Sequence, residues 1–486
     1  MVLAIAPLSC AVGPNFARPN PPASQRYTFE EQPSRTVAAE GAVQHFTPGA
    51  KITVDWWHLF DCPALNTVLT QAFARNPTLQ AAQAALRQSQ DNLRAGYGIF
   101  YPQIGASFQP SRQQFSPARF GENTSPSIFN LYTLSATVGY VLDIWGGERR
   151  TVEGLGAQAE AQYYNEEGSY LTLAGNVINT IVAEAAYAGE IEATEQLISF
   201  LEQQEGITAA QIRGGTVAYA NLLSIQSQLA TAEASLPPLQ QQLAHSRHLL
   251  ATLMGQEPAD APTLEVSFSE LTLPRDLPVS LPSTLVRERP DVMVAEAQLH
   301  YASAQIGVAT AAMLPSFTLN ATYGYNTTSL YNLFGSNAEF WTLGAGIASP
   351  LIQGPTLWYQ RKAAIDAYQQ ALGIYRQTVL AALAQVADVL DALQHDAQTL
   401  KAQSEALGAS AEALRLIDAN YKAGTVNYLD VLIADYQYQE AHLGYIQALG
   451  QRFQDTTALF VALGGGWQPA PSTKRTSCCD ATPVTP

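Results

Sequence analysis

The sequence has little charge, and most of the charge that it has is negative. Charged residues make up 14% of its 486 residues and the formal net charge is −16, whereas a typical soluble domain is about 25% charged. The negative balance and the lack of a Lys/Arg cluster argue against nucleic acid as a partner. Apolar residues reach 47%, yet no apolar run approaches the ~18 residues of a transmembrane helix. We therefore expect many buried or lipid-facing surfaces without a membrane-spanning helix.

Patterns that carry catalysis or bind metals are also missing. The seven histidines form no metal-ligand spacing, and neither a G-x-S-x-G motif nor a P-loop occurs. A glycine run at 464–466 follows a predicted helix rather than preceding one, so it does not form a phosphate-binding loop. The four cysteines, Cys10, Cys62, Cys478 and Cys479, lack zinc-ligand spacing. We expect no enzymatic activity, no cofactor and no metal.

The chain repeats itself. The segment from Pro77 to Pro102 aligns without a gap on the segment from Pro290 to Pro315. A second block, Arg213 to Tyr219, repeats as Lys422 to Tyr428 at nearly the same offset. A unit of roughly 210 residues is too long for a solenoid and fits two fused copies of one module. We expect the first copy over residues 61–270 and the second over residues 271–467.

One β-hairpin is predicted in each half, at about 102–144 and about 315–352. Apolar residues from Ile104 to Phe108, and again from Phe317 to Tyr325, alternate with small or polar residues. A period of two predicts strands with one apolar face. Four strands alone would leave open edges, so we expect closure with strands of other subunits.

A long helical hairpin is predicted after each β-hairpin, at about 149–254 and about 356–463. In the first helix of the second helical hairpin, every seventh residue of one series is apolar, which is typical of a coiled coil. These positions are Leu372, Val379, Val386, Leu393, Leu400, Leu407, Leu414 and Tyr421. Turns are predicted at Gly214-Gly215 and at Ala423-Gly424. We expect Pro237-Pro238 to interrupt and kink the return helix of the first half.

The two ends of the chain differ from the repeats. Residues 1–10 look like the end of an apolar signal segment that closes on Cys10, but no positive residue precedes Arg18. Either the segment is a truncated lipoprotein signal or it is an unstructured amino terminus. Residues 11–60 are rich in proline and polar residues and predict an extended arm, and residues 468–486 predict a disordered tail.

Taken in order, these motifs resemble the TolC-like outer-membrane factors, in particular the lipoprotein branch that serves drug-efflux pumps. The resemblance covers about residues 10–467. The motifs that carry it are Cys10 to Pro19, Asp55-Trp56-Trp57, Asn76-Pro77 with Arg289-Pro290-Asp291, the segment Asp143 to Gly147, and Asn420 to Thr425 followed by Asp430 to Leu432.

The resemblance implies an α+β membrane protein. Three chains of four strands would form a twelve-stranded β-barrel in the outer membrane, and their antiparallel helices would continue it as an α-helical coiled-coil barrel into the periplasm. The expected partners are two further copies of the chain, a periplasmic adaptor, an inner-membrane efflux pump of the RND type, and outer-membrane lipid. The expected function is passive conduction of drugs or small solutes to the exterior.

Two other functions remain open on the sequence alone. The same scaffold would serve protein export in a type I system, although a lipoprotein-like start at Cys10 favours efflux. A periplasmic coiled-coil scaffold without a channel would use the long helices but would not need two hairpins with an apolar face.

The resemblance also implies which residues act at the periplasmic tip. By alignment, Asp430 occupies the position of an acid that rings the channel constriction, and Asn221 is its counterpart in the first half. Three Asp430 carboxylates near a threefold axis would repel one another and attract cations. Ile433 stands where some relatives have a second acid, so we expect one acidic ring at most. The alternative is that Asp430 is a solvated charge on a helix face.

A latch that holds the tip closed is the second expectation. The candidates for its hydrogen bonds are Tyr421, Lys422, Arg213, Tyr219 and Tyr428, and Tyr421 also fits a packing role because it continues the series of sevens. The family's basic latch position is Val426 here, so that bond is not expected. Gly214, Gly215 and Gly424 would form the tip turns, and Cys10 would carry the acyl chains of a lipoprotein.

Overall fold

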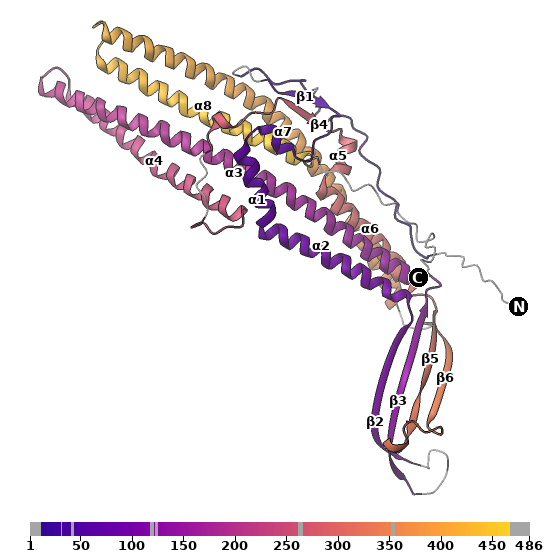
Figure 1. The fold of residues 1–486 in the computed structure, drawn as a ribbon. Coiled ribbons are helices and arrows are strands. Elements are labelled where there is room, and N and C mark those ends of the chain that lie inside the picture. The colour runs from indigo at the N-terminus through magenta and orange to yellow at the C-terminus, as the bar shows by residue number, and fades with distance from the viewer. Residues whose placement is uncertain are drawn as a thin grey trace.

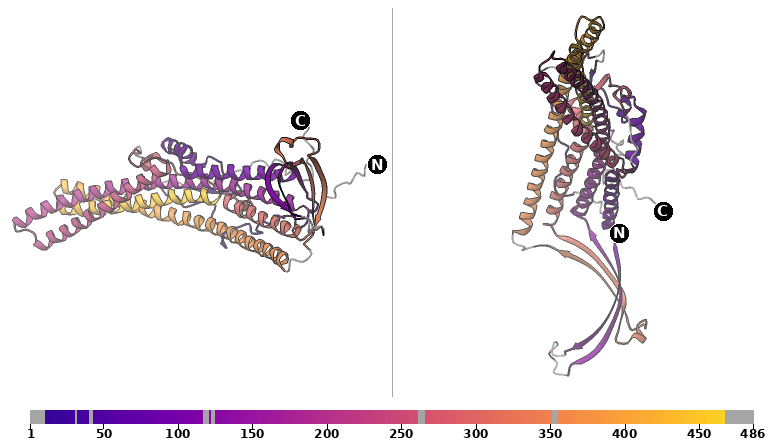
Figure 2. Two further views of the ribbon diagram at one scale, coloured as in Figure 1. Left: turned by 90° about the horizontal axis from the view of Figure 1, so that it is seen from below. Right: turned by 90° about the vertical axis from the view of Figure 1, so that its left-hand side faces the viewer.

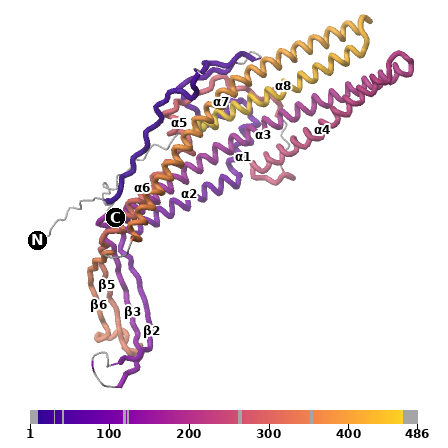
Figure 3. The backbone as a smooth tube through the Cα atoms, turned by 180° about the vertical axis from the view of Figure 1, so that it is seen from behind, coloured from indigo at the N-terminus to yellow at the C-terminus, as the bar shows by residue number. Residues whose placement is uncertain are grey.

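The computed structural model describes residues 11–30, 32–39, 43–116, 121, 125–260, 266–350 and 355–466. A long bundle of helices meets a curved, four-stranded sheet at one end (Figure 1). Two further views show the curvature of the sheet and the length of the helical hairpins (Figure 2). The turns of those hairpins lie at the end of the bundle that is farthest from the sheet (Figure 3).

Both halves of the chain have the same order of elements. The first half contains α2 (Pro77–Gly96), η2 (Tyr97–Phe100), β2 (Gln103–Phe115), β3 (Ser127–Leu142), α3 (Gly147–Arg213) and α4 (Tyr219–Leu253). The second half contains α6 (Pro290–Ala311), β5 (Ser316–Thr327), η5 (Leu330–Asn332), β6 (Glu339–Ala348), α7 (Thr356–Lys422) and α8 (Tyr428–Ala462). The outgoing helices α3 and α7 both have 67 residues, and the return helices α4 and α8 both have 35.

Six short elements surround the middle of the bundle. They are β1 (His45–Pro48), η1 (Trp56–Phe60), α1 (Pro63–Arg75), η4 (Phe268–Glu270), β4 (Asp276–Val279) and α5 (Pro282–Glu288). The predicted extended arm is therefore partly structured, because β1 pairs in parallel with β4 and Trp56 of η1 stacks on Phe460 at 4.9 Å. Both features depend on residues more than 200 positions away in the chain.

The starts of α2 and α6 are each hydrogen-bonded to the end of the return helix in the same half of the chain. Asn76 caps α2 by accepting a hydrogen bond from the Leu79 N–H at 3.0 Å, and its Nδ2 donates to the carbonyl of Leu253 at 2.9 Å. In the second half, Arg289 pairs with Asp291 at 2.7 Å and donates to the carbonyl of Ala462 at 2.7 Å. Polar side chains thus satisfy helix-end groups that would otherwise lack partners.

The register of the sheet puts its apolar side chains on one face. Strand order is β2-β3-β5-β6, and all three pairings are antiparallel. Two apolar rows across the sheet are Ile104, Val138, Ala321, Leu343 and Ala106, Ala136, Tyr323, Trp341. The row between them, on the opposite face, is Gly105, Thr137, Thr322, Thr342. Because side chains alternate between faces, these rows make one face apolar and the other small or polar in this part of the sheet. Toward the far ends of the strands the separation is broken, because Arg112, Asn130 and Glu339 lie on the first face.

Burial of the apolar residues at every seventh position of α7 changes with distance from the sheet. Val386, Leu393 and Leu400 of α7 are buried, whereas Leu407 and Leu414 are only half-buried and Tyr421 is exposed. Coiled-coil positions need a partner helix on their own face. One chain therefore supplies that partner for the middle of α7 but not for its tip.

The prediction that Pro237-Pro238 interrupts the return helix was wrong. Helix α4 runs without a break through both prolines. A proline deprives the carbonyl four residues earlier of its N–H partner, here those of Glu233 and Ala234. Both residues are exposed, so water can satisfy the freed carbonyls while α3 supports the helix along its length.

Candidate functional site

The two tip turns are built in the same way. In the first, the Gly215 N–H donates to the Ile212 carbonyl at 2.9 Å and the Thr216 N–H to the Gln211 carbonyl at 3.1 Å. In the second, Gly424 and Thr425 make the corresponding bonds at 2.9 and 3.0 Å. This is the Schellman pattern, which needs a left-handed residue after the helix.

Only two of the three predicted turn glycines have the left-handed backbone. Gly215 and Gly424 have φ of 73° and 76°, whereas Gly214 has φ of −78° and ends its helix in a right-handed conformation. Ala423 stands at the position equivalent to Gly214 and has φ of −81°. The backbone conformation at position 214 therefore does not require glycine.

Asp430 lies at the beginning of α8 and has a structural partner. Its N–H donates to the Asn427 side chain at 3.0 Å, and its carboxylate accepts from the Asn427 N–H at 3.1 Å. The pair forms a capping box. The sequence pattern Asn427-x-x-Asp430 is typical of such a box, but the cap was not predicted from it. Asp430 as a whole residue is half-exposed.

Asn221 is the first-half counterpart of Asp430, and it occupies a different setting. It is exposed in the first turn of α4 and lines a groove that also touches Leu429 and Ile433 of α8. Within one chain, the groove brings Asn221 to the region of α8 that holds Asp430, but Asp430 does not line the groove.

The five latch candidates separate into two groups. The rings of Tyr421 and Tyr428 lie 5.2 Å apart, and the Tyr428 hydroxyl donates to Gln203 of α3 at 3.3 Å. Lys422 pairs within its own helix, with Asp418 at 2.6 Å. Across the part of the chain that the structure describes, the side chains of Arg213 and Tyr219 make no hydrogen bond or ion pair. Tyr428 is thus the candidate that joins the two hairpins.

A polar seam continues this contact between α3 and α8. Gln439 donates to Gln196 at 3.3 Å, and Gln447 donates to Glu190 at 3.4 Å. Between these contacts and Tyr428 lies Asp435, which is 3% exposed and has an unpaired carboxylate oxygen within the described residues. Burial raises the pKa of Asp435 to about 6, and a hydrogen bond from Gln439 partly offsets the shift. The sequence does not reveal this seam because its partners come from different halves.

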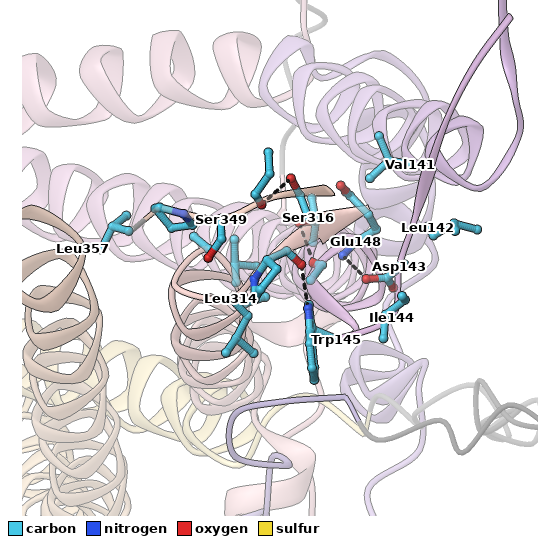
Figure 4. A pocket seen from close by; sticks show the side chains of 18 residues that line it. Val141, Leu142, Asp143, Ile144, Trp145, Glu148, Leu314, Ser316, Ser349 and Leu357 are labelled. Atoms are coloured by element: carbon cyan, nitrogen blue, oxygen red, sulfur yellow. Dashed lines mark hydrogen bonds between the residues drawn. The ribbon is translucent and has the colours of Figure 1, made fainter. Parts of the chain in front are cut away.

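The junction between sheet and helices forms a pocket of about 580 Å³ (Figure 4). Asp143 accepts hydrogen bonds from the backbone N–H groups of Glu148 and Arg149, both at 3.1 Å, so it caps the first turn of α3. Trp145 donates through Nε1 to the carbonyl of Pro315 at 2.8 Å, which ties β3 to the start of β5. The motif from Asp143 to Gly147 therefore fixes the angle at which the long helices leave the sheet.

The first described residues of the chain are bound at this same junction. The Val12 N–H donates to the Trp145 carbonyl at 2.8 Å, and Arg150 donates to Asn15 at 2.7 Å. Farther along, Arg18 pairs with the buried Glu296 at 2.6 Å. Cys10 itself lies outside the described residues, as do Cys478 and Cys479.

Over the described residues, no helix combines the length and the apolar character needed to cross a membrane. In that same part of the chain, no three His, Cys, Asp or Glu side chains gather in a way that would hold a metal ion.

A curved sheet continued by two long helical hairpins is a fold shared with solved outer-membrane channels. The chain belongs to the outer membrane efflux protein family, whose model matches residues 68–256 and 281–465. The family and the outer-membrane location expected from the sequence are thereby confirmed.

Two curated relatives and one solved structure illustrate the similarity. The pyoverdine export outer membrane protein OpmQ of Pseudomonas putida is 28% identical over 421 residues, which cover 85% of this chain and 88% of that protein. The probable efflux pump outer membrane protein TtgC of the same species is 27% identical over 478 residues, with coverage of 94% and 93%. The outer-membrane channel OprN superimposes with a TM-score of 0.84 over 95% of this chain and all of that chain, at 24% identity.

Proposed function

We propose that this protein is the outer-membrane conduit of a tripartite efflux system and passively conducts drugs or other small solutes to the exterior. The observation that carries the proposal is the register of the sheet. One face presents rows of Ile, Leu, Tyr and Trp, and the other presents rows of Gly, Ser and Thr. A strand that is apolar toward lipid and polar toward an aqueous lumen has this alternation.

The conduit is formed by three copies of the chain. Strands β2 and β6 are the edges of the four-stranded sheet, and neither has a second neighbour among the described strands. Unpaired backbone groups are costly in lipid, so the edges must pair with other chains. Three curved sheets would close a twelve-stranded barrel, and three sets of α3, α4, α7 and α8 would continue its lumen. The half-buried every-seventh positions of α7 near Tyr421 would then pack against helices of neighbouring chains.

The partners follow from the same architecture. A periplasmic adaptor and an inner-membrane pump, of the RND type, would deliver solutes at the helical tips and supply the energy. The names of OpmQ and TtgC, a pyoverdine export protein and an efflux pump protein, support a role in the export of small solutes.

Gating would take place at the tip turns. Three Asp430 carboxylates around the threefold axis would form a cation-attracting constriction, with Asn221 in the neighbouring wall. Tyr428 and Gln203 would hold the two hairpins together in the closed state, and Tyr421 would pack on Tyr428. Opening the tip requires these contacts between the hairpins to be lost.

Lipidation of Cys10 is the remaining part of the proposal. Val12 is hydrogen-bonded to Trp145 where the sheet meets the helices, so an acylated Cys10 would lie close to the membrane surface. Acyl chains would add an anchor to the inserted barrel. Mass spectrometry of the amino-terminal peptide, compared with that of Cys10→Ser, tests the modification.

Reconstitution into planar lipid bilayers tests the function. The purified protein is expected to insert from detergent and to give discrete conductance steps. Failure to insert, or insertion without any conductance even after the tip contacts are weakened by Tyr428→Phe, would rule out a conduit. A protein that spans no lipid but binds an adaptor would instead be a periplasmic scaffold.

A further inference from the structure

Two carboxyl groups meet in the middle of the second helical hairpin, one from each helix. Asp396 belongs to α7 and Asp455 belongs to α8, and their side chains are within hydrogen-bonding contact. Asp396 Oδ2 is buried and receives no hydrogen bond from a donor within the described residues. Each helix therefore contributes an acidic group to one contact, and part of that contact is shielded from water.

Two ionised carboxylates cannot form a hydrogen bond with each other. An ionised carboxylate only accepts, whereas a protonated one has an O–H that donates. Two like charges in contact also disfavour ionisation of both groups. The contact between Asp396 and Asp455 therefore needs a proton on one of the two groups or a cation between them.

Arg452 favours the proton over the cation. It is 0% exposed, and its positive charge already acts on Asp396, so a second cation there would be repelled. With one proton, the single remaining carboxylate balances the charge of Arg452. Asp455 Oδ2 accepts a hydrogen bond from Gln451 at 2.8 Å, whereas Asp396 has the buried oxygen without a donor. The proton therefore belongs on Asp396, from which it is donated to Asp455.

The electrostatic surroundings of Asp396 agree with this assignment. Burial, followed by the hydrogen bond and the negative charge of Asp455, raises the pKa of Asp396 from 3.8 to about 8, and the charge of Arg452 offsets part of the shift. The extended arm adds two titratable groups nearby, Arg35 and His45, and both residues are exposed.

The extended arm lies against both helices beside this pair. Arg452 of α8 donates to the side chains of Gln44 and Thr36 at 3.2 and 3.4 Å, and these two arm residues are 0% and 2% exposed. On the α7 side, Gln394 donates to the carbonyl of Arg35 at 3.5 Å. Movement of the arm away from the helices would therefore bring water to the region of the pair.

We propose that Asp396 and Asp455 share one proton that joins α7 to α8, and that loss of this proton releases the arm from the two helices. Without the proton, two negative charges stand against the single positive charge of Arg452 in a shielded place, which is unfavourable. Water reaches these charges once the arm has moved. The inference does not depend on the proposed conduit function.

Linkage gives the direction of the pH dependence. The bound arm holds the raised pKa of Asp396, whereas a released arm lets it return toward 3.8. The contribution of the proton to arm binding is therefore complete below 3.8 and is lost as the pH rises through about 8. Between pH 6 and pH 8, the population with a released arm should rise at least tenfold.

Tryptic cleavage after Arg35 measures this release on the full-length protein in detergent. The next residue, Thr36, is buried and bound to Arg452, so cleavage requires the arm to move. The unmodified protein and Asp396→Asn are digested at the same pH, and the ratio of their rates removes the pH dependence of the protease. We expect this ratio to be at least tenfold higher at pH 8 than at pH 6, because the introduced amide donates to Asp455 at every pH.

Asp391→Asn is the matched control, since it changes an exposed aspartate of the same helix. It should be cleaved as the unmodified protein is at both pH values. If Asp396→Asn retained the pH dependence of the unmodified protein, the proposal would be overturned.

Infrared spectroscopy detects the proton itself. At pH 6, the difference spectrum between the unmodified protein and Asp396→Asn should contain the C=O band of a protonated carboxylic acid, and this band should be lost as the pH rises past 8. If Asp396→Asn does not fold, Asp455→Asn replaces it, and the band should then be lost at a lower pH because the neighbouring negative charge is gone. Carboxylate bands alone at pH 6 would mean that a cation bridges the pair, and would contradict the shared proton.

Discussion

At the scale of single residues, Asp430 has a structural role in the fold and a proposed role in the function. Its carboxylate accepts the Asn427 N–H in the capping box of α8, and it is also the proposed acid of the constriction. The sequence alone left a ring acid and a solvated charge as alternatives. The cap gives Asp430 a role in helix stability that does not depend on a channel, so the two roles must be tested separately.

Two substitutions of Asp430 separate these roles. Asp430→Asn removes the charge but keeps an oxygen that can accept the Asn427 N–H, whereas Asp430→Ala removes both. We expect Asp430→Ala to cost about 1 kcal/mol of helix stability and Asp430→Asn to cost much less, as measured by hydrogen exchange of the first turn of α8. Both should reduce cation selectivity in bilayers to the same extent. Cation selectivity that persists in Asp430→Asn would show that the charge does not form the constriction.

Glu184 is a second residue whose chemistry the sequence does not reveal. It lies on α3, is buried, and has two carboxylate oxygens without hydrogen-bond partners in the described structure. Burial raises its pKa from 4.5 to about 7, and the charge of Arg247 offsets part of the shift. The burial comes from packing of the long helices against one another, which no local pattern indicates.

This pKa makes stability depend on pH. The folded state holds the Glu184 proton more tightly than the unfolded state, so the stabilisation is complete below the unfolded pKa of 4.5 and is lost as the pH rises through about 7. The thermal midpoint of the protein in detergent should therefore fall between pH 5 and pH 8 by more than that of Glu184→Gln. Glu202→Gln, an exposed change on the same helix, should keep the slope of the unmodified protein. If the thermal midpoint of Glu184→Gln fell with pH as steeply as that of the unmodified protein, other titratable groups would be the cause.

At the scale of elements, the sequence predicted the strands and the long helices well but not their exceptions. Alternation from Ile104 to Phe108 lies within β2, and the predicted tip turns lie where α3 and α7 end. These patterns are local, so a single segment contains the whole signal. The continuity of α4 through Pro237-Pro238 and the pairing of β1 with β4 depend on tertiary support, so local rules failed there.

The tip turns give a prediction at this scale. Gly424→Ala and Gly215→Ala place a side chain on a left-handed backbone, which costs about 1 kcal/mol for an ordinary residue. No atom lies within 4 Å of the added Cβ at either position, so the cost is in the backbone alone. Gly214→Ala, at φ of −78°, is the matched control and should be neutral or slightly stabilising. Thermal unfolding and hydrogen exchange of the turn peptides measure the difference, and equal effects at Gly214 and Gly215 would contradict the assigned turn geometry.

At the scale of the whole molecule, the sequence indicated the architecture and the family. Each motif is a weak signal by itself, but the order of the motifs and their duplication make a specific pattern. The sequence does not predict the groove between α3, α4 and α8, because its lining residues come from three helices that are brought together only by tertiary packing. In the proposed assembly, the two open edges of the sheet and the half-buried every-seventh positions near the tip of α7 would pair with other copies of the chain, and the apolar face of the sheet would meet lipid. On this proposal, the single chain is an incomplete unit.

The stoichiometry of the detergent-extracted protein tests this central claim most directly. Native mass spectrometry should give one species with three times the chain mass of 52.3 kDa, and that species should persist until the barrel is unfolded. A chain that is monomeric and remains dispersed in water without detergent would contradict the account.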